Sequence, residues 1–100
     1  VLKGYRTLIC SPDGKVKVNP TGNPGMASGG TGDVLSGLIA SEAMQVRDLL
    51  QAVVNAVFVH GLSGDLAAEK VGQKSLTATD LIKFLPDAMR FIATGGRNET

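Results

Sequence analysis

A run of glycines followed at once by a carboxylate is the part of this sequence best suited to chemistry. Residues 29–33 read Gly-Gly-Thr-Gly-Asp, where a Pro- and Gly-rich stretch gives way to a helix-like apolar pattern. The uncovered N–H groups of a helix start can bind an anion, and the helix dipole adds positive potential there. A carboxylate repels phosphate, but it is a suitable base for a hydroxyl that receives a phosphoryl group. The pattern therefore indicates phosphoryl transfer to an alcohol, with Asp33 as the base.

The same residues have an ordinary explanation, because Asp is favoured in the first turn of many helices. The pattern is also neither of the two common phosphate loops. No Lys-Ser or Lys-Thr pair follows the glycines, and no Gly-x-Gly-x-x-Gly follows a strand. The hypothesis that Asp33 is a catalytic base therefore needs support from other segments of the sequence.

The segments before the glycine run predict a hairpin and an irregular loop. Residues 7–11 and the alternating residues 15–18 flank a Ser-Pro-Asp-Gly turn, which is typical of a β-hairpin. Prolines and glycines between residues 19 and 30 argue against regular structure.

Helical periodicity follows and predicts about four helices. The first covers residues 31–44, and the second begins after Asp48, which can cap it. Gly61 and Gly64 interrupt the apolar pattern, so that a further helix could continue or resume through residues 65–71. Thr77 and Asp80 form a capping box for a helix that ends by residue 93, with a kink or restart at Pro86.

Four ordered segments resemble the ADP-dependent NAD(P)H-hydrate dehydratases of the ribokinase-like superfamily. Residues 19–33, Asn-Pro-Thr-Gly-Asn-Pro-Gly-Met-Ala-Ser-Gly-Gly-Thr-Gly-Asp, resemble their anion hole and catalytic Asp motif. Residues 2–7 resemble their Lys-Gly-x-x-Thr nucleotide segment, and residues 60–69 and 75–82 resemble their later helices. The resemblance covers residues 1–90. It implies a three-layer ribokinase-like α/β fold, with residues 1–93 as its C-terminal part. The glycine-containing polar end of the sequence, residues 94–100, predicts a disordered tail.

The resemblance also implies an activity. ADP would drive the dehydration of the (6S) hydrate of NADH or NADPH, which gives AMP and phosphate and restores the cofactor. ATP could take the place of ADP, and Mg²⁺ would be held mainly by the nucleotide phosphates. Two alternatives stay open: an ATP-dependent kinase of a sugar or vitamin-precursor alcohol, and a non-catalytic nucleotide-binding module.

Site residues follow from the same resemblance. Asp33 would be the catalytic base and would contact the substrate hydroxyl. Asn55 and His60 are candidates for the adenine side, although a hydrogen-bonded core amide and a structural histidine explain them as well. Nucleotide-binding residues would be Lys3, Gly4, Tyr5, Arg6, Thr7, Gly29, Gly30, Thr31 and Gly32.

Composition and charge limit the kinds of partner and metal site that we expect for this protein. The net charge is +1 and basic residues do not cluster, so we expect no nucleic-acid partner. The apolar stretch over residues 49–62 is too short to span a bilayer, and we expect no membrane partner. One Cys and one His cannot form a zinc site. The lone Cys10 fits a reducing cytoplasm, and its apolar run predicts that it is buried.

The 100 residues suit one globular unit. The resemblance implies a parent domain more than twice as long, so we expect this chain to be a fragment that is inactive alone. In the full-length protein we expect a homo-oligomer, together with a fused or separate NAD(P)H-hydrate epimerase.

Overall fold

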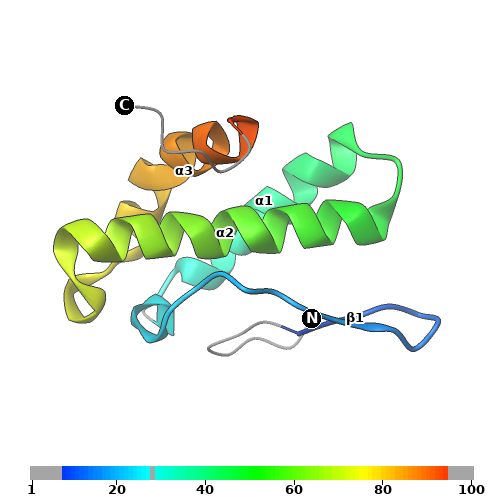
Figure 1. Cartoon of the computed structure of the whole chain (residues 1–100), viewed down its shortest axis with the longest axis horizontal. Helices are drawn as coiled ribbons and strands as arrows, with labels where there is room; N and C mark the ends of the chain where they lie inside the picture. Colours follow the sequence, from blue (N-terminus) through cyan, green and yellow to red (C-terminus); the bar gives the residue numbers. More distant parts are fainter. Residues whose placement is uncertain (1–7, 28, 95–100) are drawn as a thin grey trace.

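The computed structural model describes residues 8–27 and 29–94 as a short hairpin followed by helices. Figure 1 shows α2 running through the middle of the molecule, with the hairpin on one side and α3 on the other. In chain order the elements are β1 (Leu8–Cys10), β2 (Val16–Val18), the 3-10 helix η1 (Pro24–Ala27), α1 (Thr31–Gln45), α2 (Leu49–Val71), the 3-10 helix η2 (Gln73–Ser75) and α3 (Ala78–Ala93).

The predicted hairpin is confirmed. β1 and β2 pair antiparallel, with Ile9 opposite Lys17. The amide of Ser11 donates to the carbonyl of Lys15 at 2.9 Å and closes the turn. Successive side chains of a strand point to opposite faces, so Ile9 is buried against the helices while Cys10 is exposed. The prediction of a buried Cys10 was therefore wrong.

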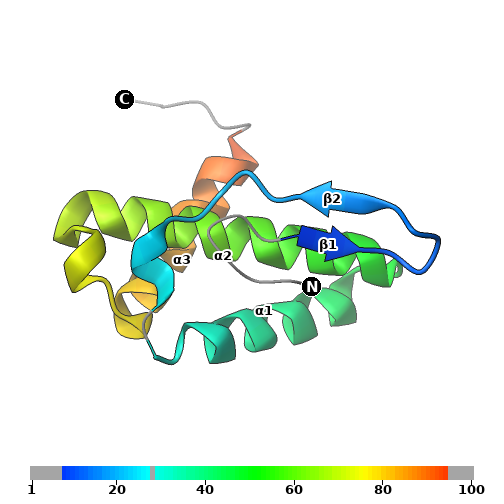
Figure 2. The same ribbon diagram turned by 90° about the horizontal axis from the view of Figure 1, so that it is seen from below.

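The core lies where the hairpin meets α1 and α2, which Figure 2 shows side by side. Ile9 of β1, Leu35 of α1 and Val57 of α2 form a buried cluster, and partly buried residues of both helices, such as Ile39 and Val53, pack around it. Each such side chain contributes about 1.5–3 kcal/mol by leaving water. This cluster fixes the hairpin on the helices.

α2 is the central helix because it packs extensively against both α1 and α3, which touch each other far less. Four of its positions with no exposed surface carry small side chains, which allow helices to approach closely. These positions are Ala52, Ala56, Ser63 and Ala67, each 0% exposed.

The cap signals in the sequence are confirmed at two helix starts. The side chain of Asp48 accepts the amide of Leu50 at 3.0 Å at the start of α2. Thr77 and Asp80 form the reciprocal capping box of α3, which ends at Ala93 as predicted.

The described residues form three α-helices, where the sequence suggested about four. Gly61 and Gly64 lie inside one continuous 23-residue helix, and Pro86 lies inside α3 without ending it. Both glycines are buried where segment 19–27 crosses α2, so their reason is a tertiary contact rather than a helix end. A short 3-10 turn, η1, also occupies part of the segment for which we expected no regular structure.

The length of α2 also overturns our argument about membrane spanning. This 23-residue helix is long and apolar enough to cross a membrane by length and composition alone. The central helix of a folded domain can have the same length and composition, and 44% of the most apolar stretch of α2 is buried within the fold. Its packing between α1 and α3 favours the role of a core helix.

Candidate functional site

The candidate site centres on the first turn of α1. Gly30 precedes that turn with φ of 88°, in the left-handed region that glycine adopts without strain. A Cβ at Gly30 would also lie 3.1 Å from the Cβ of Ala78, which leaves little room for a side chain. Glycine at this position therefore lets the chain reverse sharply into the helix.

The start of α1 has the geometry of an anion site. No side chain among the described residues caps it. The amide of Val34 reaches the carbonyl of Gly30 at 3.3 Å and begins the helical ladder, so the amides of Gly32 and Asp33 precede that ladder. Gly29 and Gly30 are exposed, and a Cβ on Gly29 would meet nothing within 4 Å. A ligand can therefore approach this backbone from solvent.

Asp33 lies in this first turn and is exposed. Its carboxylate is thus placed beside the uncovered amides, in the field of the helix dipole. The hydroxyl of Thr31 instead points inward, because it donates to the carbonyl of Met26 at 2.8 Å. In this arrangement the hydroxyl of Thr31 is used within the protein and is not offered to a ligand.

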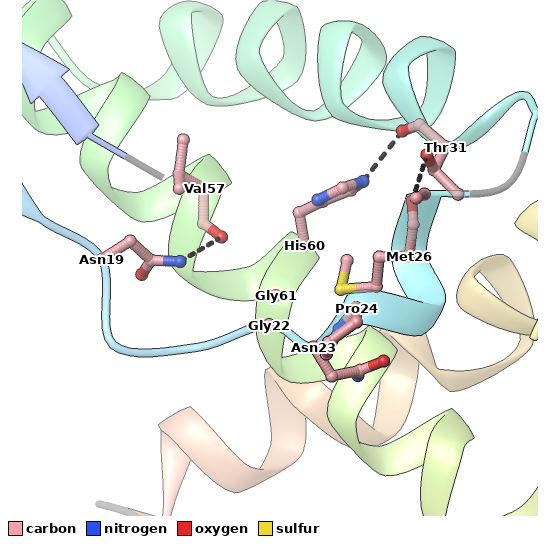
Figure 3. A pocket seen from close by; sticks show the side chains of 10 residues that line it. Asn19, Gly22, Asn23, Pro24, Met26, Thr31, Val57, His60 and Gly61 are labelled. Atoms are coloured by element: carbon pink, nitrogen blue, oxygen red, sulfur yellow. Dashed lines mark hydrogen bonds between the residues drawn. The ribbon is translucent and has the colours of Figure 1, made fainter. Parts of the chain in front are cut away.

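Beside this turn lies a pocket of about 470 Å³ between segment 19–27 and α2, drawn in Figure 3. Its lining is mainly apolar with a few polar groups, the usual character of a small-molecule site. The lining residues are Asn19, Gly22, Asn23, Pro24, Met26, Ala27, Thr31, Val57, His60 and Gly61.

His60 contributes to this pocket from α2 and is 6% exposed. Its Nε2 lies 2.8 Å from the carbonyl oxygen of Thr31, as the dashed line in Figure 3 marks. A carbonyl oxygen only accepts, so Nε2 carries the proton of this hydrogen bond. His60 therefore holds the first residue of α1, which supports the structural role for this histidine.

Asn55 lies elsewhere, in a second hollow lined by residues of α2 and by Met89 and Ile92 of α3. Its carboxamide accepts from Gln51 at 2.8 Å and donates to Glu42 of α1 at 3.4 Å. The structure thus separates our two adenine-side candidates, and Asn55 has the hydrogen bonds of an interhelix amide.

Segment 19–27 is fastened to α2 by polar groups that the sequence did not single out. Asn19 donates to the carbonyl of Val57 at 3.4 Å, and the hydroxyl of Thr21 donates to that of Phe58 at 3.1 Å. Asp65 of α2 accepts hydrogen bonds from the segment as well. The two Asn-Pro pairs of this segment indicate side-chain bonds to nearby backbone at turns, but they do not indicate these bonds to α2, about forty positions away.

One group of predicted site residues cannot be placed by geometry. Lys3, Gly4, Tyr5, Arg6 and Thr7 lie outside the described residues, as does residue 28 of the loop. Across the described part of the chain, no three His, Cys, Asp or Glu side chains gather as a metal site.

The chain thus combines a hairpin, three packed helices and a glycine-lined helix start, which are elements of an α/β domain. The chain belongs to the NAD(P)H-hydrate dehydratase family, whose sequence profile matches residues 1–87. It is 51% identical over 90 residues to the bifunctional NAD(P)H-hydrate repair enzyme Nnr of Thermofilum pendens, covering 90% of this chain and 17% of that protein. It is 43% identical over 86 residues to the ADP-dependent (S)-NAD(P)H-hydrate dehydratase of Bacillus subtilis, covering 86% of this chain and 31% of that protein.

The fold prediction is confirmed by solved structures. The ADP/ATP-dependent NAD(P)H-hydrate dehydratase from Bacillus subtilis, co-crystallized with ATP/Mg²⁺, superposes with a TM-score of 0.85 at 41% identity. The match covers 90% of this chain and 32% of that one. The chain therefore has the fold of part of that α/β domain, and it spans about a sixth to a third of the length of the curated relatives described here.

Proposed function

We propose that the native protein containing this chain repairs hydrated nicotinamide cofactors. ADP would drive dehydration of the (6S) hydrate of NADH or NADPH, and the products would be NADH or NADPH, AMP and phosphate. One observation carries the proposal: a helix start with a left-handed glycine, which no side chain of the described residues caps, presents Asp33 beside the amides of its first turn. Membership of the dehydratase family and the names of its relatives support this choice of substrate.

The proposed reaction has two steps. Asp33 takes the proton of the ring hydroxyl while that oxygen attacks the terminal phosphorus of ADP, and AMP leaves. The C–O bond of the new phosphate ester then breaks, a ring proton is lost, and the double bond of the dihydronicotinamide returns. Amides at the start of α1 would stabilise the charge that develops on the phosphoryl oxygens, by about 3 kcal/mol for each well-placed donor.

Nucleotide and metal fit this site in different ways. The exposed glycines and the amides of Gly32 and Asp33 suit a phosphate group. The described residues contain no cluster of metal ligands, so Mg²⁺ would be bound mainly by the phosphates of ADP or ATP, a common arrangement for this ion. Its charge would neutralise that of the transferred group. Lys3 to Thr7 would complete the nucleotide site.

The proposal also includes the localisation, the oligomeric state and a partner activity of the protein. We infer a cytoplasmic enzyme that forms a homo-oligomer. The name of the Thermofilum pendens relative describes a bifunctional repair enzyme, which supports a fused or separate epimerase that interconverts the two hydrate epimers. Such an epimerase would let a dehydratase that is specific for one epimer act on the whole pool.

The experiment incubates the native protein with ADP, Mg²⁺ and NADPH hydrate and follows NADPH absorbance and AMP by chromatography. We expect equal amounts of NADPH, AMP and phosphate. A stable phosphorylated alcohol would support the kinase alternative, and nucleotide binding without turnover would support the non-catalytic module. The 100 residues alone should give no turnover, because a reaction that must hold two substrates in register can lose about 7–11 kcal/mol without that positioning.

A further inference from the structure

Asp65 of α2 accepts two hydrogen bonds from the segment that leads to the candidate site. Its Oδ2 accepts the backbone N–H of Gly22, and its Oδ1 accepts the side-chain amide of Asn23, both at 2.9 Å. The carboxylate is partly buried. Both facing groups are donors, so a side chain with two acceptor oxygens is required to satisfy them together.

From Asn23 the hydrogen bonds continue to the start of α1. The side-chain oxygen of Asn23 accepts the amide of Gly25 at 3.0 Å, and its carbonyl accepts the amide of Met26 at 3.1 Å. The carbonyl of Met26 then accepts the hydroxyl of Thr31 at 2.8 Å, which Figure 3 shows. A short series of hydrogen bonds thus connects Asp65 with the first residue of α1.

A second anchor from α2 meets the same residue. His60 donates to the carbonyl of Thr31, so that the hydroxyl of Thr31 is held by the segment and its carbonyl by the helix. The backbone that presents Gly32 and Asp33 is therefore located by two points of α2 rather than by the loop alone.

We propose that Asp65 is a positioning residue for the reaction of Asp33. It fixes segment 22–26 on α2, and through Thr31 it sets where the first turn of α1 lies. This inference rests on the proposed function for its kinetic consequences, whereas its structural consequence can be measured without any reaction. Displacement of reacting groups by a fraction of an ångström to one ångström can cost about 10²-fold in rate.

An exchange of two side chains tests the proposal in the native protein. Asp65→Asn keeps the shape but presents an amide N–H₂ to one of the two donors. Asn23→Asp places two carboxylates against each other. The double variant N23D/D65N restores every bond, since Asn at position 65 accepts from Gly22 and donates to Asp at position 23, which still accepts from Gly25.

We expect each single variant to lose about 10- to 10²-fold in kcat, with a smaller change in KM for ADP. The double variant should return to within about threefold of the parent, because the two effects belong to one contact and are not additive. Unchanged kcat in D65N, or a double variant no faster than the slower single variant, would overturn the proposal. Asp48→Asn is the matched control, because this residue caps the same helix and Asn caps equally well.

A second readout separates this proposal from the proposed function. Amide resonances of Gly32 and Asp33 in the protein without nucleotide should shift in D65N and return in the double variant. A purely local role for Asp65 would shift Gly22 and Gly25 and leave Gly32 and Asp33 unchanged, which would contradict us. If the parent protein lacks dehydratase activity but these shifts occur, the proposed function fails while the positioning role stands.

Discussion

Two neighbouring regions of this molecule are held in opposite ways. Segment 19–27 is fastened to α2 by hydrogen bonds between residues that lie about forty positions apart in the chain, for example Gly22 and Asp65. The hairpin turn, in contrast, is held by Ser11, Asp13 and Lys15, which lie within four positions of one another. β2 is exposed on both faces, with Val16 and Val18 each 57% exposed.

The difference shows that long-range contacts concentrate near the candidate site, whereas the hairpin turn depends on local ones. α2 supports the candidate site on one side, because it forms hydrogen bonds with the polar groups of segment 19–27, which leads to that site. They do not complete the hairpin, whose apolar valines face away from the helices' core cluster. Substitutions near the site should therefore have larger effects than substitutions at the hairpin turn.

The largest effect is expected at Asp33, in the region supported by α2. Asp33→Asn in the native protein should lower kcat by about 10²- to 10⁴-fold, because the amide cannot accept the hydroxyl proton. Affinity for ADP should be retained or rise, since a negative charge near the phosphate is removed. Steady-state kinetics and calorimetry with ADP measure the two quantities.

The control for Asp33→Asn is again Asp48→Asn, the same chemical change at another helix start. It should leave both kcat and the affinity unchanged. A D33N variant that retains more than about half of the parent kcat, far from the loss expected of a missing base, would remove Asp33 from the mechanism.

A smaller effect is expected where segment 19–27 crosses α2. Gly61→Ala places a methyl group against the side chain and backbone of Thr21, in contacts too short to be accommodated without movement. The free energy of unfolding should fall by about 1–3 kcal/mol, as for other overpacked positions. Chemical unfolding of the native protein measures this change.

Gly37→Ala is the matched control, since its Cβ would point into open space on the exposed side of α1. That variant should gain about 0.5–1 kcal/mol, because alanine is the better helix former. If both variants are stabilised alike, the close contact between segment 19–27 and α2 does not exist in solution.

Local signals in the sequence predicted local structure well, and the misses have a tertiary origin. Asp48 and the Thr77–Asp80 pair predicted the starts of α2 and α3, because the hydrogen bonds of a helix cap join residues at most three positions apart. The sequence left open whether the helix continues past Gly61, because the reason for this glycine is the approach of Thr21, forty positions earlier in the chain. The family resemblance pointed to the glycine loop as the candidate site, but it carried no information about the hydrogen bonds of Asp65.

The smallest effect is expected at the hairpin turn. Asp13 is exposed, and hydrogen bonds lower the pKa of its carboxyl, first that of the Ser11 hydroxyl and then that of the Lys15 amide. A carboxyl with a lowered pKa in the folded state contributes stability above its unfolded pKa. That contribution is lost as the pH falls through the folded pKa. The loss should therefore begin below about pH 4, the ordinary range of Asp.

Ser11→Ala tests this cause directly, because it removes the first of the two donors and leaves the Lys15 amide in place. The pKa of Asp13, followed by the carbon chemical shift of its carboxyl during an NMR titration, should rise toward the ordinary value. Activity at neutral pH should stay the same, since the turn lies outside the pocket lining. An unchanged pKa in Ser11→Ala would mean that the hydroxyl of Ser11 does not hold the carboxylate. A marked loss of activity would mean that the hairpin turn and the site are coupled. That result would contradict the view that the two regions are held independently.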